Sequence, residues 1–109
     1  MDAETWASDA RLSAFLASKQ MLRGQFSTLF AASLDGRMRV LADPTGVRIP
    51  TINLADRDYF RRTLAEQRAL VSEPVGGRVS SEPVIVFTAP LRNAHGIYGV
   101  VGASLRLAS

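Results

Sequence analysis

Residues 83–107, PVIVFTAPLRNAHGIYGVVGASLRL, contain two apolar runs separated by the turn sequence Asn93-Ala94-His95-Gly96. The first run includes Val84-Ile85-Val86-Phe87, which is apolar at consecutive positions and therefore predicts a strand with both faces covered, in the middle of a sheet. A turn this short joins antiparallel neighbours, because parallel strands need a long crossover connection. The two runs therefore predict adjacent antiparallel strands, at residues 83–91 and 97–107.

A β-hairpin and a short strand are expected before these two strands. Residues 26–34 alternate between two sides at strand spacing, and residues 37–42 form the expected return strand. Asp35-Gly36 between them is a strong hairpin signal, because both turn positions tolerate positive φ. Asp43-Pro44-Thr45-Gly46 then begins a loop, and a further short strand is predicted at residues 69–74.

Two helices are expected on either side of the hairpin. Residues 3–23 contain neither Pro nor Gly and are rich in strong helix formers, which predicts one long N-terminal helix that ends at Gly24. Residues 56–67 predict a second helix, with Asn53 or Asp56 as its N-cap. The first helix is long for a small domain, so part of it is expected to pack on a partner chain. Its apolar stripe, which includes one lysine, consists of Leu12, Phe15, Leu16, Lys19 and Leu22.

These elements predict an α+β fold in one domain. The order is a long helix, a hairpin, a second helix and three strands joined by tight turns. The best arrangement is a single antiparallel sheet of five strands with helices covering one face. A chain of 109 residues fits one such domain. It buries roughly 65% of its unfolded surface, which is enough for one core.

Composition and charge exclude several classes of function. Apolar residues make up 47% and charged residues 21%, which is ordinary for a folded globular protein and argues against disorder. The net charge of +3 is a mild excess, and the basic residues are spread along the chain, without the stripe typical of a nucleic-acid binder. The absence of cysteine excludes disulfides and thiolate metal sites. No run approaches the roughly 20 apolar residues needed to cross a bilayer, and no signal peptide is visible.

The sequence contains no enzymatic constellation. The only histidine, His95, lies in a turn beside Gly96, where a solvated side chain is the expected state. No nucleophile elbow, P-loop or dinucleotide-binding fingerprint occurs. The sequence therefore predicts no catalytic residue, no metal site and no cofactor, and it favours a binding protein over an enzyme.

The start of the second predicted helix carries the most informative polar residues, Asp56-Arg57-Asp58-Tyr59. Arg57 in the first turn opposes the helix dipole, which favours negative charge at that end. In one interpretation Asp56 and Asp58 neutralise Arg57, and Asp58 also pairs with Arg62. In the other, Arg57 and the free N–H groups of the first turn bind one anion. A carboxylate suits the arginine because it accepts two parallel hydrogen bonds, and Tyr59 adds a hydroxyl donor and an aromatic wall.

Three further regions are candidates for the walls of a ligand pocket. Ser72 lies at the end of a predicted strand, and Thr88 is a polar residue inside an apolar strand. The last strand carries small residues at Gly99, Gly102 and Ser104, and small residues weaken a strand interior unless something approaches closely. The first helix, a second chain and a ligand are the three alternatives for what approaches.

Four segments taken together resemble the Cache family, whose members are PAS-like extracytoplasmic sensor domains of bacterial receptors. The order and spacing of the segments carry the resemblance, which covers residues 26–107. It implies a five- to six-stranded antiparallel sheet, with residues 1–24 as a long N-terminal helix that often pairs in a homodimer and residues 25–109 as the sensor core. It also implies a ligand pocket between the sheet and the loop–helix segment before the central strands. The four segments are Leu54–Arg61, Val71–Arg78, Pro83–Pro90 and Gly96–Leu105.

The resemblance also implies a membrane-anchored parent receptor, with this domain in the periplasm and a diguanylate cyclase, histidine kinase or chemotaxis module as output. The chain is then expected to be an excised sensor. In the family, the arginine of an Arg-x-aromatic-aromatic motif contacts a ligand carboxylate and the aromatics line the pocket; here these are Arg57, Tyr59 and Phe60. Val75 and Ser104 stand where the amino-acid-binding branch has a tyrosine and an acidic residue. This departure argues against an α-amino acid and favours a simple carboxylate or another small anion.

The residues and the resemblance together predict a sensor that binds a small anion, such as a carboxylate. Binding is expected to shift the loop from Asp43 to Asn53 and to alter how the first helix meets its partner. The alternative is a ligand-free structural module that only dimerises through that helix. The predicted ligand-binding residues are Arg57, Tyr59, Phe60, Ser72, Phe87, Thr88 and Ser104.

Overall fold

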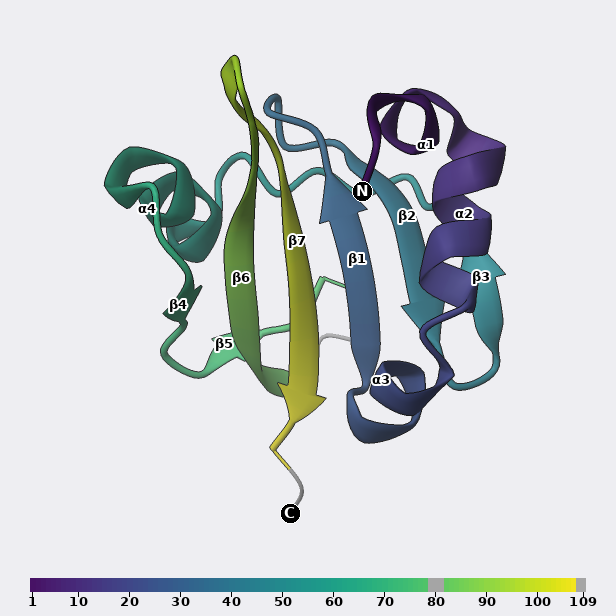
Figure 1. Cartoon of the computed structure of the whole chain (residues 1–109). Helices are drawn as coiled ribbons and strands as arrows, with labels where there is room; N and C mark the ends of the chain where they lie inside the picture. The colour runs from purple at the N-terminus through teal and green to yellow at the C-terminus, as the bar shows by residue number, and fades with distance from the viewer. Residues whose placement is uncertain (79–81, 108–109) are drawn as a thin grey trace.

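The computed structural model describes residues 1–78 and 82–107, which form four helices and one sheet of seven strands (Figure 1). The predicted sensor core, residues 25–109, therefore includes a few positions that lie outside the described residues. The helices are α1 (Ala3–Ala7), α2 (Asp9–Ala17), α3 (Gln20–Gln25) and α4 (Asp58–Glu66). The strands are β1 (Thr28–Ala32), β2 (Met38–Asp43), β3 (Gly46–Arg48), β4 (Leu70–Val71), β5 (Val75–Gly76), β6 (Pro83–Asn93) and β7 (Gly96–Arg106).

The paired strands of the sheet are antiparallel, in the order β3-β2-β1-β7-β6-β4, with β5 also paired to β6. The two longest strands, β6 and β7, lie side by side, as the two apolar runs predict. Strand β7 also pairs with β1, so the N-terminal hairpin and the C-terminal strands form one continuous sheet. The predicted α+β fold with an antiparallel sheet is confirmed.

Both faces of the sheet are covered, which differs from the single covered face expected from the order of elements. On one face α2 packs over β2 and β3, and Leu12 and Leu16 belong to the same buried cluster as Leu29. On the other face α4 packs over β6 and β7, and Phe60 belongs to the same buried cluster as Phe30. Because successive side chains of a strand point to opposite faces, β1 supplies Leu29 to one layer and Phe30 to the other.

The N-terminal region forms three short helices in place of the single long helix expected. Ser8 separates α1 from α2, because its hydroxyl accepts a hydrogen bond from Arg11 N and caps α2. Ser18 ends α2 and donates its hydroxyl to Phe15 O (2.6 Å). Serine side chains compete with the helix ladder in this way, which a summed helix propensity does not register.

The close approach expected at the last strand involves two aromatic rings. A Cβ atom added to Gly99 would lie 2.5 Å from the indole of Trp6, which belongs to α1. A Cβ atom added to Gly102 would overlap the ring of Phe30 on the neighbouring strand β1. Helix α1 thus explains why position 99 is a small residue, and the neighbouring strand β1 explains the small residue at position 102.

Strands β3 and β5 are absent from the sequence prediction. The turn that begins at Asp43 returns the chain onto β2, so residues expected in a loop form β3, and Asp43 pairs with Gly46. Residues expected in a glycine turn form β5, because Val75 pairs with Val84 of β6. Both strands are too short to leave a periodic pattern in the sequence.

Helix α4 begins one residue after Arg57, which is its N-cap residue and makes no side-chain capping bond. Neither predicted cap is used. Asn53 Oδ1 accepts a hydrogen bond from Ala55 N, and Asp56 forms an ion pair with Arg78. Because both side chains are engaged elsewhere, the start of α4 has no side-chain acceptor among the described residues.

The segment that leads into α4 docks on the turn of the β1–β2 hairpin. Leu54 N donates to Gly36 O (2.8 Å), and Met38 N donates to Ile52 O (2.9 Å). Gly36 has a φ of +91°, which allows the hairpin turn to meet this segment closely. This docking fixes where the chain enters α4, and therefore where Arg57 lies.

Candidate functional site

A cavity of about 150 Å³, here called the inner cavity, lies between α4 and the sheet. Its apolar lining comes from strands β1, β2, β5 and β6, from the loop before α4 and from Tyr59 of α4. The polar residues that line it are Ser27, Thr28, Asp43, Arg78, Ser104 and Arg106. An apolar cavity with a few polar groups at its edge is the usual form of a small-molecule site.

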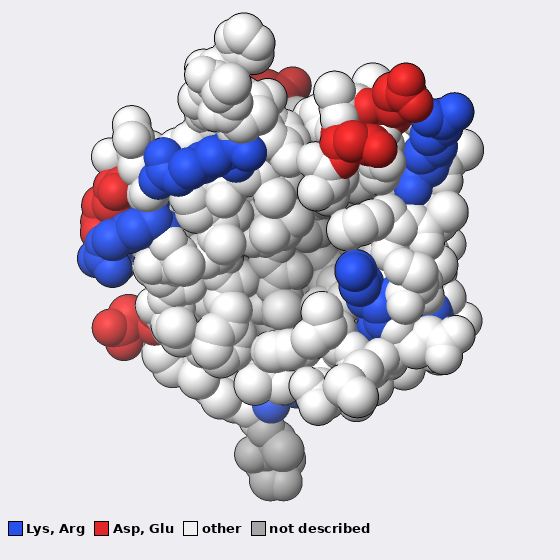
Figure 2. Space-filling view, in the orientation of Figure 1, with Lys and Arg blue, Asp and Glu red and all other residues white. Residues whose placement is uncertain are grey.

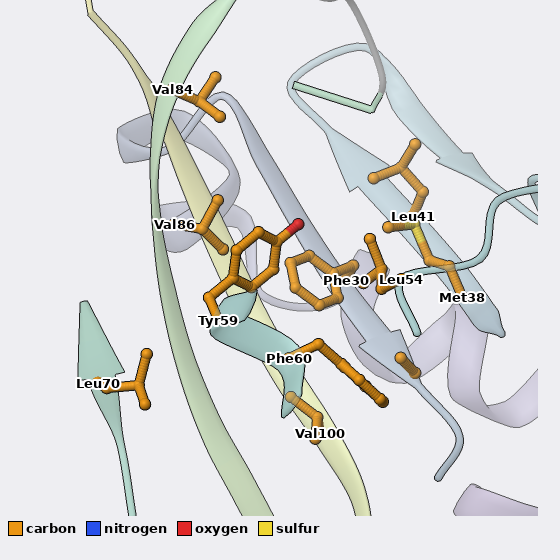
Figure 3. Packing of buried hydrophobic residues seen from close by; sticks show 11 residues of the cluster. Phe30, Met38, Leu41, Leu54, Tyr59, Phe60, Leu70, Val84, Val86 and Val100 are labelled. Carbon is orange, nitrogen blue, oxygen red and sulfur yellow. The ribbon is translucent and has the colours of Figure 1, made fainter. Parts of the chain in front are cut away.

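Tyr59 projects from α4 toward the sheet. Figure 3 shows its ring between Val86 and Phe30, with the hydroxyl directed toward the space between Val84 and Leu41. Burial raises the pKa of the Tyr59 hydroxyl, and the nearby charge of Arg57 opposes that rise. The hydroxyl is therefore protonated at neutral pH and can donate a hydrogen bond to a bound molecule.

A second space of about 240 Å³, here called the outer hollow, lies beside the start of α4. Arg57, Tyr59 and Ser72 line it, so the structure brings three of the predicted ligand-binding residues together. Tyr59 and Val75 also line the inner cavity, so these two side chains separate the two spaces. The other residues that line the outer hollow are Asp56, Asp58, Arg61, Arg62 and Glu73.

Arg57 is half-buried, and its Nε is fully buried without a hydrogen-bond partner among the described residues. The neighbouring aspartates have other arrangements: Asp56 pairs with Arg78 (2.5 Å), and Arg62 pairs with Glu66 (2.8 Å) instead of Asp58. Among the described residues neither aspartate forms an ion pair with Arg57, although the charge of Arg57 helps to lower the pKa of Asp56. A buried donor without an acceptor is costly, and the rest of the Arg57 side chain borders the outer hollow.

Ser72 and Ser104 line the two spaces, but protein atoms already engage both hydroxyls. Ser72 Oγ donates to Glu73 O (2.8 Å) and accepts from Val86 N (2.9 Å). Ser104 Oγ lies 2.5 Å from Thr28 Oγ1 across the β1–β7 pair. One of these two hydroxyls donates to the other, which leaves a single hydroxyl hydrogen for a further acceptor in the inner cavity.

Phe60 and Thr88, also predicted as pocket walls, line neither space. Phe60 is 2% exposed and lies in the core, because consecutive helix residues point about 100° apart and Tyr59 takes the direction of the cavity. Thr88 Oγ1 lies 2.6 Å from Thr63 Oγ1, and Thr63 donates to Tyr59 O (2.6 Å), so Thr88 is the donor in the pair. Thr88 thus holds α4 against β6.

Phe87 lies on the opposite side of the sheet from Arg57, so its predicted role beside Arg57 is wrong. Adjacent strand residues face opposite ways, and Thr88 already faces α4. The ring of Phe87 packs edge-on against Phe26, with 5.8 Å between centroids. Both Phe87 and Thr88 border an apolar hollow on that side of the sheet, although the Thr88 hydroxyl points to Thr63 of α4.

This apolar hollow measures about 320 Å³ and lies beside α2 and α3. Figure 2 shows it as a white depression near the centre of that face. Lys19 is the charged residue in its lining, with Nζ 4.6 Å from the centroid of the Phe15 ring. This hollow is larger than the inner cavity but offers few polar groups to orient a ligand, so the candidate site is on the α4 side.

The sequence pattern does not identify Arg78 or Thr63 as residues of the site. Arg78 follows two glycines in an expected turn, yet it lines the inner cavity and reaches Asp56, 22 positions earlier. Thr63 lies on the expected second helix, and an i, i+4 hydrogen bond to Tyr59 O is a local signal for a buried threonine there. The tertiary partners, Asp56 for Arg78 and Thr88 for Thr63, depend on packing that the sequence pattern does not specify.

Asp43 at the end of β2 is a strongly hydrogen-bonded carboxylate at the edge of the inner cavity. It accepts from the hydroxyl (2.6 Å) and the N–H (2.8 Å) of Thr45, from Gly46 N (3.0 Å) and from Arg48 (3.0 Å). These contacts, the Thr45 hydroxyl foremost, lower the pKa of Asp43 to about 2.

We expect this depressed pKa to appear in the pH dependence of stability. The ordinary aspartate pKa is about 3.9, so the Asp43 contribution is fully present above about pH 4. It is lost as the pH falls through the folded-state pKa of about 2. Asp43→Asn should therefore lower the melting temperature at pH 7 and have progressively less effect toward pH 2. Asp35→Asn in the hairpin turn is the control, and an effect of Asp43→Asn that is equal at both pH values would contradict the assignment.

Metal binding and membrane spanning are two further properties of the described part of the chain. Within residues 1–78 and 82–107, no group of three or more His, Cys, Asp or Glu side chains is placed to hold a metal ion. Over the same residues, the helices are each too short or too polar to cross a bilayer.

Comparisons with known proteins give matches among solved structures. No family model matches the chain, and no curated protein matches it. The sensory domain of the Campylobacter jejuni chemoreceptor Tlp3 with isoleucine bound superposes with a TM-score of 0.80 at 12% identity, covering 97% of this chain and 44% of that one. The ligand-binding domain of the Pseudomonas aeruginosa chemoreceptor PctB with L-Gln gives 0.72 at 21% identity, covering 93% and 40%.

A third match is the ligand-binding domain of the Pseudomonas aeruginosa chemoreceptor PctC in complex with GABA. Its TM-score is 0.65 at 16% identity, and the match covers 95% of this chain and 56% of that one. The chain thus spans roughly half the length of these sensor domains, and at such identities the similarity is one of fold. The chain has the PAS-like fold of the ligand-binding sensor domains of bacterial chemoreceptors, as the resemblance to the Cache family predicts.

Proposed function

We propose that this chain is a ligand-binding sensor domain of a bacterial signalling receptor, and that its ligand is a small anion such as a carboxylate. The observation that supports this most directly is Arg57, which lines the outer hollow and whose buried Nε has no acceptor among residues 1–78 and 82–107. Isoleucine, L-Gln and GABA, bound by the similar sensor domains, each carry a carboxylate. The protein thus binds a ligand and catalyses no reaction on it.

In this mechanism the carboxylate accepts hydrogen bonds from the guanidinium of Arg57 and from N–H groups in the first turn of α4. The helix dipole places partial positive charge at the same point, which further favours an anion. Tyr59 and Val75 face the ligand from the wall between the outer hollow and the inner cavity. The loss of the amino-acid-specific residues at Val75 and Ser104 favours a ligand without an α-ammonium group.

Signalling requires that the ligand bind one conformation better than another. The elements placed to move are α4, which Thr63 and Thr88 tie to β6, and the loop that docks on the hairpin. Such a movement reaches the N-terminal helices through the sheet. We propose that a homodimer contact lies at these helices. The parent receptor is then membrane-anchored, with this domain outside the cytoplasm. A ligand-free module that only dimerises is the competing function, and the next experiment separates the two.

Arg57→Ala should abolish stabilisation by small organic acids. Hydrogen bonds to charged groups contribute about 1.5–3 kcal/mol, so the affinity should fall roughly 10- to 150-fold. A thermal-shift screen of organic acids on both proteins measures this. Arg61→Ala is the matched control, because Arg61 is exposed, lines the same hollow and carries the same charge. The proposal fails when no acid stabilises the wild-type protein, or when Arg57→Ala responds as strongly as wild type does.

A further inference from the structure

The apolar hollow lies on the face of the sheet away from α4. Figure 1 shows α2 in front of β2, whereas no described helix covers the long strands β6 and β7 on this side. Phe87 of β6 and Val101 and Ala103 of β7 line the hollow from the sheet, and each is only half-buried. Phe15 and Phe26 line it from the helical side and are also half-buried. These five side chains retain apolar surface that a ligand would remove from water.

The shape and volume of the hollow suit a small apolar molecule. It measures about 320 Å³, which is above the roughly 300 Å³ at which small-molecule pockets begin. Its walls come from α2, α3 and the strands, and the surface is hollowed there (Figure 2). A two-fold contact between copies of the chain would set this concave patch on itself and leave the space unfilled. A flexible hydrocarbon chain can instead follow the walls, and it needs no polar groups to hold it.

Lys19 supplies the charge in the lining of the hollow. The residue is exposed, and its Nζ lies 4.6 Å from the centroid of the Phe15 ring, at the boundary between the apolar lining and water. Among residues 1–78 and 82–107, no Asp or Glu lines the hollow and none forms an ion pair with Lys19. A cation in this position complements a molecule with an anionic head and an apolar tail.

We infer that the apolar hollow is a second binding site, for a single-chain anionic amphiphile of the fatty-acid class. The carboxylate of the amphiphile pairs with Lys19, and its hydrocarbon tail lies along Phe15, Phe87 and Ala103. The sheet separates this site from Arg57, so the inference goes beyond the proposed function and does not rest on it. A bound tail contacts α2 and the strands β6 and β7 together, and it therefore holds the N-terminal helices against the C-terminal strands.

The tail is tested by isothermal titration calorimetry with hexanoate, octanoate and decanoate, each below the concentration at which it forms micelles. Burial of one methylene corresponds to about four-fold in affinity, so in this open hollow each added methylene should give roughly two- to four-fold. Ala103→Leu fills the floor of the hollow and should weaken octanoate about ten-fold or more. Ala14→Leu is the matched control, because Ala14 is an exposed alanine of α2 outside the hollow.

The head group is tested with Lys19→Gln. An exposed ion pair is worth little, so octanoate should bind this variant roughly two- to five-fold more weakly than wild type. Uncharged 1-octanol should bind both proteins equally, because it presents the same tail without the carboxylate. Arg11→Gln is the matched control, since Arg11 is an exposed cation of α2 that lies outside the hollow, and it should leave octanoate binding unchanged.

The outcomes separate this site from the one at Arg57 and from other occupants of the hollow. Saturable octanoate binding that survives Arg57→Ala and is lost in Ala103→Leu supports the inference. Binding that is lost in Arg57→Ala and kept in Ala103→Leu overturns it, as does the absence of binding by all three fatty acids. Without octanoate binding, a wild-type dimer that Ala103→Leu dissociates in sedimentation equilibrium assigns the hollow to a second copy. Likewise, adsorption to phosphatidylglycerol vesicles without octanoate binding assigns it to a membrane. Circular dichroism verifies that each variant is folded.

Discussion

Replacing Phe60 by alanine is expected to destabilise the domain by about 3–5 kcal/mol, the usual cost of deleting a buried aromatic ring. Phe60 is 2% exposed and belongs to the cluster that joins α4 to the sheet, together with Phe30, Leu54 and Val100. Natural domains are stable by about 5–15 kcal/mol, so the variant should lose a large part of its stability. Urea unfolding followed by circular dichroism measures the change.

Two further variants separate packing from ligand contact at this position. Phe60→Leu keeps most of the volume and should cost less than Phe60→Ala while retaining the acid response of wild type. Arg61→Ala, the next residue on α4, is exposed and should change stability by no more than about 0.5 kcal/mol. Wild-type stability in Phe60→Ala, combined with a lost acid response, would show that Phe60 is a ligand wall after all.

Replacing Gly36 by alanine is expected to cost about 2–5 kcal/mol, from backbone strain and from overlap together. The φ of Gly36 is +91°, in the left-handed region that L side chains avoid. A Cβ atom there would lie 2.6 Å from Ala55 N, 2.7 Å from Asn53 Oδ1 and 2.8 Å from Ala55 Cβ. These atoms belong to the segment that places Arg57, so the variant should also respond less to organic acids than wild type does.

Two other glycines in the chain serve as controls for the two causes. Gly96 has a φ of +115° with open space around its Cβ position, so Gly96→Ala should show backbone strain alone, about 1–2 kcal/mol. Gly46 has neither a positive φ nor a close neighbour, so Gly46→Ala should be neutral or slightly stabilising. Thermal unfolding of the three variants gives the order. A cost for Gly36→Ala no larger than that for Gly96→Ala would exclude the proposed overlap.

The parts of the fold that could be predicted from the sequence are those with long, local patterns. The apolar runs of β6 and β7 and the Asp35-Gly36 turn each specify an element without reference to the rest of the chain. The N-terminal helix could not be predicted correctly. Its breaks depend on the hydroxyl groups of Ser8 and Ser18, and a serine can also lie inside an unbroken helix. Short strands such as β3 exist only because a partner strand lies beside them.

For the candidate site, the sequence pattern identifies Arg57 and Tyr59 at the start of α4, and the structure places them together at the outer hollow. The alternation of side chains along β6 turns the Phe87 ring away from α4 and the Thr88 hydroxyl toward α4. By contrast, Arg78 gains its role from the arrangement of β5 beside α4, which no local pattern encodes. Sites built by contacts between distant segments are therefore the ones that sequence reasoning misses.

The ring of Phe30 fills the space next to Gly102, and this constrains how the two positions can change during evolution. The ring occupies the volume that any larger residue at 102 would need, so neither position is free to change alone. Among homologous proteins, a bulkier residue at 102 should occur only together with a smaller one at 30, and the two substitutions should have been fixed in close succession.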